Sequence, residues 1–85
     1  EVRKLGPGEF DKLGIASWGT WGCGVSTFPW TYGEKESCYI LEGEVEVTGG
    51  GETVRFGAGD FVVFPEGLSC TWKVEKPVRK HYLFG

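Results

Sequence analysis

EVEVTGGGETVRF, residues 44–56, is the stretch of the sequence that decides the fold class. Valine and glutamate alternate strictly at its start, so that Val45 and Val47 face a core while the glutamates face water. Gly49-Gly50-Gly51 then closes a hairpin onto residues 53–56, which alternate in the same way. Two alternating strands joined by a glycine turn predict antiparallel β-structure.

Turn signals recur every 8–12 residues along the rest of the chain, a spacing typical of a β-sandwich or barrel. Val, Thr and aromatic residues dominate the segments between the turns, and such residues favour strands over helices. The only helical turn expected is at residues 10–13. The chain is therefore predicted to be all-β, with eight to ten antiparallel strands in a single domain over residues 1–85. The expected strands cover residues 2–5, 16–21, 24–29, 36–42, 44–48, 52–56, 60–64, 69–75 and 79–84.

Charge and composition exclude several classes of protein. Nine basic residues against twelve acidic ones give a net charge of −3, so there is no basic excess to bind nucleic acid. The longest apolar run, residues 61–65, is far shorter than the roughly 20 residues of a membrane helix. Three cysteines without a CxxC motif do not form a disulfide framework. Reduced thiols favour an intracellular compartment, the cytoplasm or, in a plant, the plastid.

Two strands are apolar on both faces, residues 38–41 and 61–64. A strand covered on both sides requires a second layer or a partner subunit. Tyr39 and Leu41 lie opposite the face of Cys38 and would leave an apolar patch exposed in a monomer. We therefore expect a homodimer.

The spacing of glycines and prolines resembles a known family. The first block holds Gly24, Trp30, Tyr32, Glu36 and Gly43, and the second holds Gly59, Pro65, Gly67 and Cys70. These intervals resemble the two cupin motifs, G-x5-H-x-H-x3–4-E-x6-G and G-x5-P-x-G-x2-H-x3-N. With the string 38–48, the chain resembles the small single-domain RmlC-like cupins grouped with the ureidoglycine aminohydrolase cupin domain. The resemblance implies a jelly-roll barrel, also called a double-stranded β-helix.

The resemblance also implies a metal site of three histidines and one glutamate inside the barrel. Only Glu36 matches that set, because Trp30 and Tyr32 stand at the paired histidine positions and Cys70 at the third. An indole has no lone pair to offer a metal ion. We expect the metal site to be lost and no cofactor to be bound. The aminohydrolase activity, which depends on a metal, does not follow from the fold.

A ligand site inside the barrel is the remaining expectation. The two motif strands place six side chains toward the interior: Trp30, Tyr32, Glu36, Cys38, Cys70 and Trp72. Ligand pockets are mostly apolar with a few polar groups, and this set fits that description. Glu36 would fix a ligand by accepting hydrogen bonds, and Cys70 would form the pocket floor. Trp18, Trp21 and Phe28 extend the same set into an aromatic wall.

The thiols and the single histidine allow other interpretations. Cys38 and Cys70 are small apolar core residues in one, and redox or nucleophilic thiols in another. In a third, Glu36, Cys38 and Cys70 hold a zinc ion, with Tyr32 as a further ligand. His81 is interpreted as a packed or surface residue.

Three functions remain open from the sequence. The first is a cupin that binds a small molecule inside the barrel without its metal site. The second is a metal-dependent enzyme of the ureidoglycine aminohydrolase type. The third is a structural module whose function is dimerisation.

Overall fold

The computed structural model describes residues 1–85 and contains seven strands and two short helices. The strands are β1 (Val2–Lys4), β2 (Gly19–Cys23), β3 (Ser26–Thr31), β4 (Glu36–Gly49), β5 (Glu52–Gly57), β6 (Asp60–Phe64) and β7 (Ser69–Phe84). The helices are α1 (Glu9–Lys12) and a 3-10 turn, η1 (Ile15–Ser17). All strand pairs are antiparallel, which confirms the predicted all-β fold with almost no helix.

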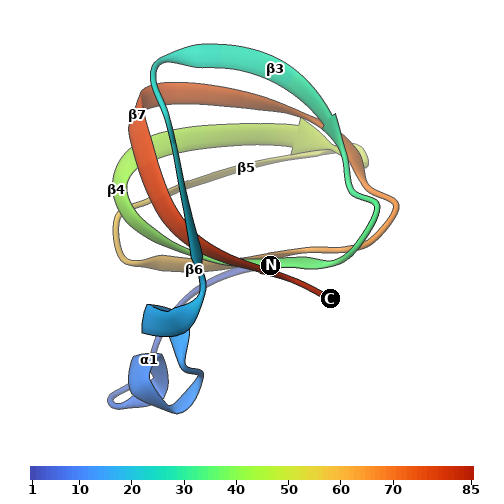
Figure 1. Ribbon diagram of the computed structural model, residues 1–85. Coiled ribbons are helices and arrows are strands. Elements are labelled where there is room, and N and C mark those ends of the chain that lie inside the picture. The colour runs from blue at the N-terminus through green and yellow to red at the C-terminus, as the bar shows by residue number, and fades with distance from the viewer.

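Two long strands, β4 and β7, pair with each other and organise the barrel (Figure 1). The first half of β4 pairs with β6, and its second half pairs with β5. In the same way, β7 pairs first with β3 and then with β2. β1 lies outside β6. The long strands therefore pass from one sheet of the jelly roll to the other, and the two sheets enclose one interior.

The predicted count of eight to ten strands is wrong, because two expected breaks do not end a strand. The register between β4 and β7 shifts around residues 40–45, which marks a bulge in a continuous ladder. Gly43 lies at this bulge with φ +104°, and an added Cβ would stand 2.7 Å from Val78 Cα. Turn residues at 43 and 76–77 therefore bend the two strands and leave them unbroken.

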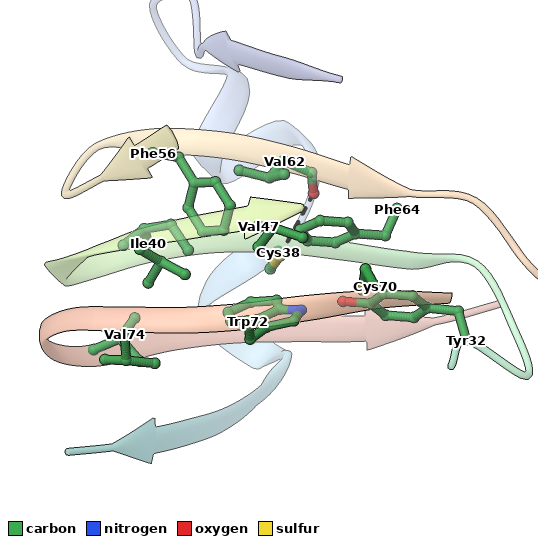
Figure 2. Close-up of a cluster of buried hydrophobic side chains, with 12 residues drawn as sticks. Tyr32, Cys38, Ile40, Val47, Phe56, Val62, Phe64, Cys70, Trp72 and Val74 are labelled. Carbon is green, nitrogen blue, oxygen red and sulfur yellow. Dashed lines mark hydrogen bonds between the residues drawn. The ribbon is translucent and has the colours of Figure 1, made fainter. Parts of the chain in front are cut away.

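One cluster of twelve buried residues fills the interior (Figure 2). Its members are Tyr32, Cys38, Ile40, Val45, Val47, Phe56, Val62, Phe64, Cys70, Trp72, Val74 and Val78. The buried positions of β4 are even-numbered up to Ile40 and odd-numbered from Val45 onward. The bulge changes this phase by one residue, so that both halves of β4 turn apolar side chains inward.

The segment between β1 and β2 lies outside the barrel (Figure 1). Residues 15–17 form η1, so the strand expected at 16–21 begins only at Gly19. From α1, Phe10 packs edge-on against Tyr39, with ring centroids 5.2 Å apart. Tyr39 is thus partly covered by its own chain, whereas Leu41 stays exposed, and the homodimer remains a prediction. The structure contains no helix with the length and hydrophobicity that a membrane span requires.

Candidate functional site

A cavity of about 190 Å³ opens beside the inner face of β2, β3, β4 and β7. Seven of its nine lining residues are hydrophobic, and all seven are aromatic. The lining residues are Trp21, Phe28, Trp30, Tyr32, Glu36, Trp72, Lys80, Tyr82 and Phe84. They come from β2, β3, β4 and β7 and from the residue that follows β3. The cavity is an aromatic pocket that holds two charged side chains.

The two charged residues of the cavity form an ion pair. Lys80 Nζ donates a hydrogen bond to Glu36 Oε2 at 2.7 Å. The side chains of Lys80 and Glu36 are only 7% and 4% exposed. Tyr32 Oη donates to the other carboxylate oxygen, Glu36 Oε1, at 2.8 Å. The Glu36 carboxylate therefore has one ionic and one neutral donor inside the barrel.

Aromatic rings surround the ammonium group of Lys80. Its Nζ lies 4.6 Å from the ring centroid of Trp72 and 5.1 Å from that of Trp21. The negative faces of indole rings attract a cation, and the attraction grows when the cation is removed from water. Burying two charges is costly, so the pair depends on such additional contacts. Glu36, Trp21 and Trp72 together hold Lys80 at the cavity wall.

Tyr32 stays protonated in this environment. Burial, followed by the negative charge of Glu36 and the hydrogen bond between them, raises the pKa of Tyr32 far above its ordinary value. The phenol therefore remains a hydrogen-bond donor to the carboxylate. Figure 2 shows the indole nitrogen of Trp72 turned toward the hydroxyl end of Tyr32. This Trp72 Nε1 is buried and has no hydrogen-bond partner.

The structure brings four of the six residues expected at the site together around the cavity. Trp30, Tyr32, Glu36 and Trp72 all line it. Trp30 lies at its edge and is 47% exposed, whereas the other three are buried. The wider aromatic wall is formed in part, because Trp18 packs against Phe61 outside the cavity lining.

Cys38 and Cys70 are not part of the cavity wall, which corrects their expected placement. The thiol of Cys38 donates to the carbonyl oxygen of Val62 at 3.6 Å, within the core cluster (Figure 2). The thiol of Cys70 donates to the carbonyl oxygen of Trp30, also at 3.6 Å. Both sulfurs point toward backbone groups of neighbouring strands, so Cys70 does not form a pocket floor.

The comparisons with known proteins assign the chain to a family. A family model described as the EutQ-like cupin domain matches residues 10–82. The chain belongs to the EutQ-like cupin family. A DUF861 family protein from Thermotoga maritima has the same fold, with a TM-score of 0.97 and 45% sequence identity. That alignment covers 100% of this chain and 98% of the other.

Two further similarities concern EutQ of Salmonella typhimurium. The structure of this ethanolamine utilization protein matches with a TM-score of 0.72 and 29% identity, over 98% of this chain and 66% of that one. In sequence, the chain is 39% identical over 56 residues to a protein named acetate kinase EutQ, across 66% of this chain. The match spans 24% of that protein, about a quarter of its length. These similarities establish the cupin fold.

The residues of this EutQ-like cupin do not fit the metal site that its superfamily implies. Glu36 is already bonded to Tyr32 and Lys80, and a lysine ammonium beside a carboxylate repels a metal cation. The side chains contain no group of three or more His, Cys, Asp or Glu residues placed to hold a metal ion. The alternative zinc site of Glu36, Cys38 and Cys70 is therefore not formed.

Burial also makes the two core thiols of this EutQ-like cupin poor nucleophiles. It raises the pKa of Cys38 to about 12, although the charge of Lys80 acts in the opposite direction. Burial raises the pKa of Cys70 as well. A thiol reacts as the thiolate, so a raised pKa makes both side chains weaker nucleophiles than an exposed cysteine. The interpretation as small apolar core residues agrees with the structure.

Sequence reasoning missed Lys80, Tyr82 and Phe84 of the cavity in this EutQ-like cupin. The sequence did contain a signal for their inward direction. Residues 78, 80 and 82 alternate along β7 and share one face, and Val78 is buried on that face. A lysine in phase with a buried valine and a tyrosine faces the interior unless the strand is interrupted. Because Lys80 is charged, its side chain was not expected to face the interior.

Proposed function

We propose that the chain binds a small, planar and largely apolar molecule inside the barrel, without a metal ion. The observation that carries this proposal is the aromatic cavity that contains the Glu36–Lys80 pair. Seven aromatic side chains offer stacking area, and the ion pair offers a single polar contact point. Cavities of this composition bind planar ligands by burying apolar surface and orient them with a few polar groups.

The proposal does not extend to catalysis by a metal centre. The donor set does not suit a metal ion, so the aminohydrolase alternative lacks the group on which its chemistry depends. The two buried thiols are poor nucleophiles, and the single histidine, His81, does not line the cavity. Binding is therefore the function that the geometry supports best.

Titration with toluene, followed by the indole N–H resonances in NMR spectra, tests the proposal. The chain has four tryptophans, and three of them, Trp21, Trp30 and Trp72, line the cavity. Trp18 lies outside the lining and serves as an internal reference. We expect saturable shifts of the three cavity indoles while Trp18 stays unchanged. The absence of saturable shifts, or shifts confined to Trp18, contradicts the proposal.

A matched pair of variants locates the binding. Trp21→Leu removes an indole that contacts both Trp72 and Lys80 at the cavity wall. Trp18→Leu removes an indole of the same size outside the cavity. We expect Trp21→Leu to weaken toluene binding about tenfold, the loss expected for a large contact area. Equal weakening in Trp18→Leu would place the ligand elsewhere.

A further inference from the structure

The cavity carries charges that cancel each other. Glu36 and Lys80 are the only charged residues among the nine that line it, and they are bonded to each other at 2.7 Å. Both side chains are almost fully buried, and the Lys80 ammonium lies over the rings of Trp21 and Trp72. The formal charge of the site is therefore zero before any ligand enters.

A charged ligand would disturb this balance. A carboxylate that approaches Lys80 also approaches the carboxylate of Glu36, because the two groups are in contact. A cation that approaches Glu36 meets the ammonium of Lys80 in the same way. In either case, a third charge is moved out of water without a counter-charge of its own, which is costly in an apolar cavity.

The pair retains hydrogen-bonding capacity for an uncharged ligand. An ammonium has three N–H donors, and Lys80 uses one of them on Glu36. Each oxygen of the Glu36 carboxylate accepts one hydrogen bond and keeps a further lone pair that can accept another. A ligand with an acceptor beside a donor matches this arrangement. A primary amide has both: its carbonyl oxygen accepts from the ammonium, and its N–H donates to the carboxylate.

We propose that the cavity selects an uncharged aromatic amide, and that it discriminates against anions and cations of the same shape through the Glu36–Lys80 pair. This inference rests on the proposed function and specifies the class of ligand. The size is appropriate, because a cavity of about 150 Å³ is known to hold benzene, and the present cavity of about 190 Å³ leaves room for one small polar group. The aromatic walls contact the ring, and the ion pair contacts the amide.

Four probes of nearly the same size test the inference at pH 7. They are benzamide, which is neutral, benzoate, which is an anion, benzamidinium, which is a cation, and toluene, which has no polar group. Binding is measured by NMR titration of the indole N–H resonances, with Trp18 as the reference outside the cavity. We expect the dissociation constant of benzamide to be about tenfold lower, or lower still, than that of either charged probe. This ratio reflects the cost of burying an uncompensated charge.

The outcomes separate the inference from the proposed function. Equal or tighter binding of benzoate or benzamidinium overturns the charge selection and leaves binding in the barrel intact. Binding of toluene without binding of benzamide also overturns the inference about an amide ligand and leaves binding in the barrel intact. If none of the four probes shifts the cavity indoles, both proposals fail. The ranking comes from the wild-type protein, so it does not depend on the folding of a variant.

Two variants then assign the selectivity to the pair. Glu36→Gln leaves the Lys80 charge without its partner, so we expect benzoate to gain affinity relative to benzamide. Lys80→Met leaves the Glu36 charge, so we expect benzamidinium to gain instead. The dispersion of the NMR spectrum shows whether each variant is folded. A folded variant whose ranking is unchanged contradicts the role of the pair.

Discussion

Lys80 and Glu36 are separated by 44 residues, yet Lys80 Nζ lies 2.7 Å from Glu36 Oε2 inside the barrel. The Lys80 backbone pairs with Ile40, four residues beyond Glu36 on the adjacent strand. The two side chains therefore extend toward each other along the inner surface. This contact joins the two long strands of the fold and supplies both charges of the candidate site.

Breaking this pair should destabilise the protein strongly. Lys80→Met leaves the Glu36 carboxylate buried without its cation, and such changes cost about 3–5 kcal/mol of unfolding free energy. Glu36→Gln/Lys80→Met removes both charges and keeps an oxygen for the Tyr32 hydroxyl, so we expect most of the loss to be recovered. Urea denaturation of the two variants measures the difference. A double variant as unstable as Lys80→Met contradicts this account.

An exposed pair provides the control for that measurement. Arg55 Nη2 lies 2.7 Å from Glu46 Oε2, and the Arg55 and Glu46 side chains are 71% and 20% exposed, well above those of Lys80 and Glu36. Ion pairs at the surface contribute about 1 kcal/mol or less. We expect Arg55→Met to shift the urea midpoint slightly, so that the large effect belongs to the buried pair.

Alkaline pH should destabilise the fold through Cys38. Its pKa is about 12 in the folded protein against an ordinary value of 9.0, so folding favours the protonated thiol. This contribution is complete below about pH 9 and is lost as the pH rises toward 12. The raised pKa of Tyr32 acts in the same direction. We expect the urea midpoint to fall between pH 9 and 11, and to fall less steeply in Cys38→Ala. An identical slope in this variant contradicts the assignment to Cys38.

The glycine at the bulge should tolerate no side chain. Gly43 has φ +104°, and a Cβ added there would stand 2.7 Å from Val78 Cα. Gly51 also has a positive φ, +80°, but an added Cβ would meet nothing within 4 Å. We expect Gly51→Ala to cost about 1–2 kcal/mol for its backbone conformation alone. Gly43→Ala adds overpacking and should cost about 3 kcal/mol or more. Similar urea midpoints for the two variants would contradict the steric argument.

The sequence predicts the fold class correctly, because the period of the side chains is a local property. Alternation at residues 44–56 was sufficient to indicate antiparallel β-structure, and the jelly roll followed from the resemblance to the cupin motifs in which Gly43, Gly59 and Pro65 lie. The continuity of β4 through Gly43 was not predictable in this way. A glycine with positive φ ends a strand or bends it, and only the partner strand decides which occurs.

The candidate site was predictable only in part, for a related reason. Glu36, Tyr32 and Trp72 follow from the motif positions and from alternation along their strands. Lys80 was not placed inside, because a lysine is rarely buried without a partner. Its partner, Glu36, is on a different strand, and a pairing across 44 residues is not visible in a local pattern. The direction of each cysteine sulfur likewise depends on the carbonyl groups of neighbouring strands.

Trp30 and Trp72 should separate ligand binding from stability, because the two indoles line the same cavity with different exposure. Trp72 is 2% exposed and packs against Phe28, Phe56 and Phe64, so Trp72→Ala should cost about 3–5 kcal/mol of unfolding free energy. Trp30 is 47% exposed and has one aromatic neighbour, Tyr32, so Trp30→Ala should cost about 1 kcal/mol or less. Because Trp30 forms the edge of the cavity, its removal should still weaken toluene binding several-fold.

Urea denaturation and NMR titration of Trp30→Ala measure the two effects separately. Unchanged affinity would place the ligand away from this edge, and a stability loss as large as that of Trp72→Ala would make Trp30 part of the core.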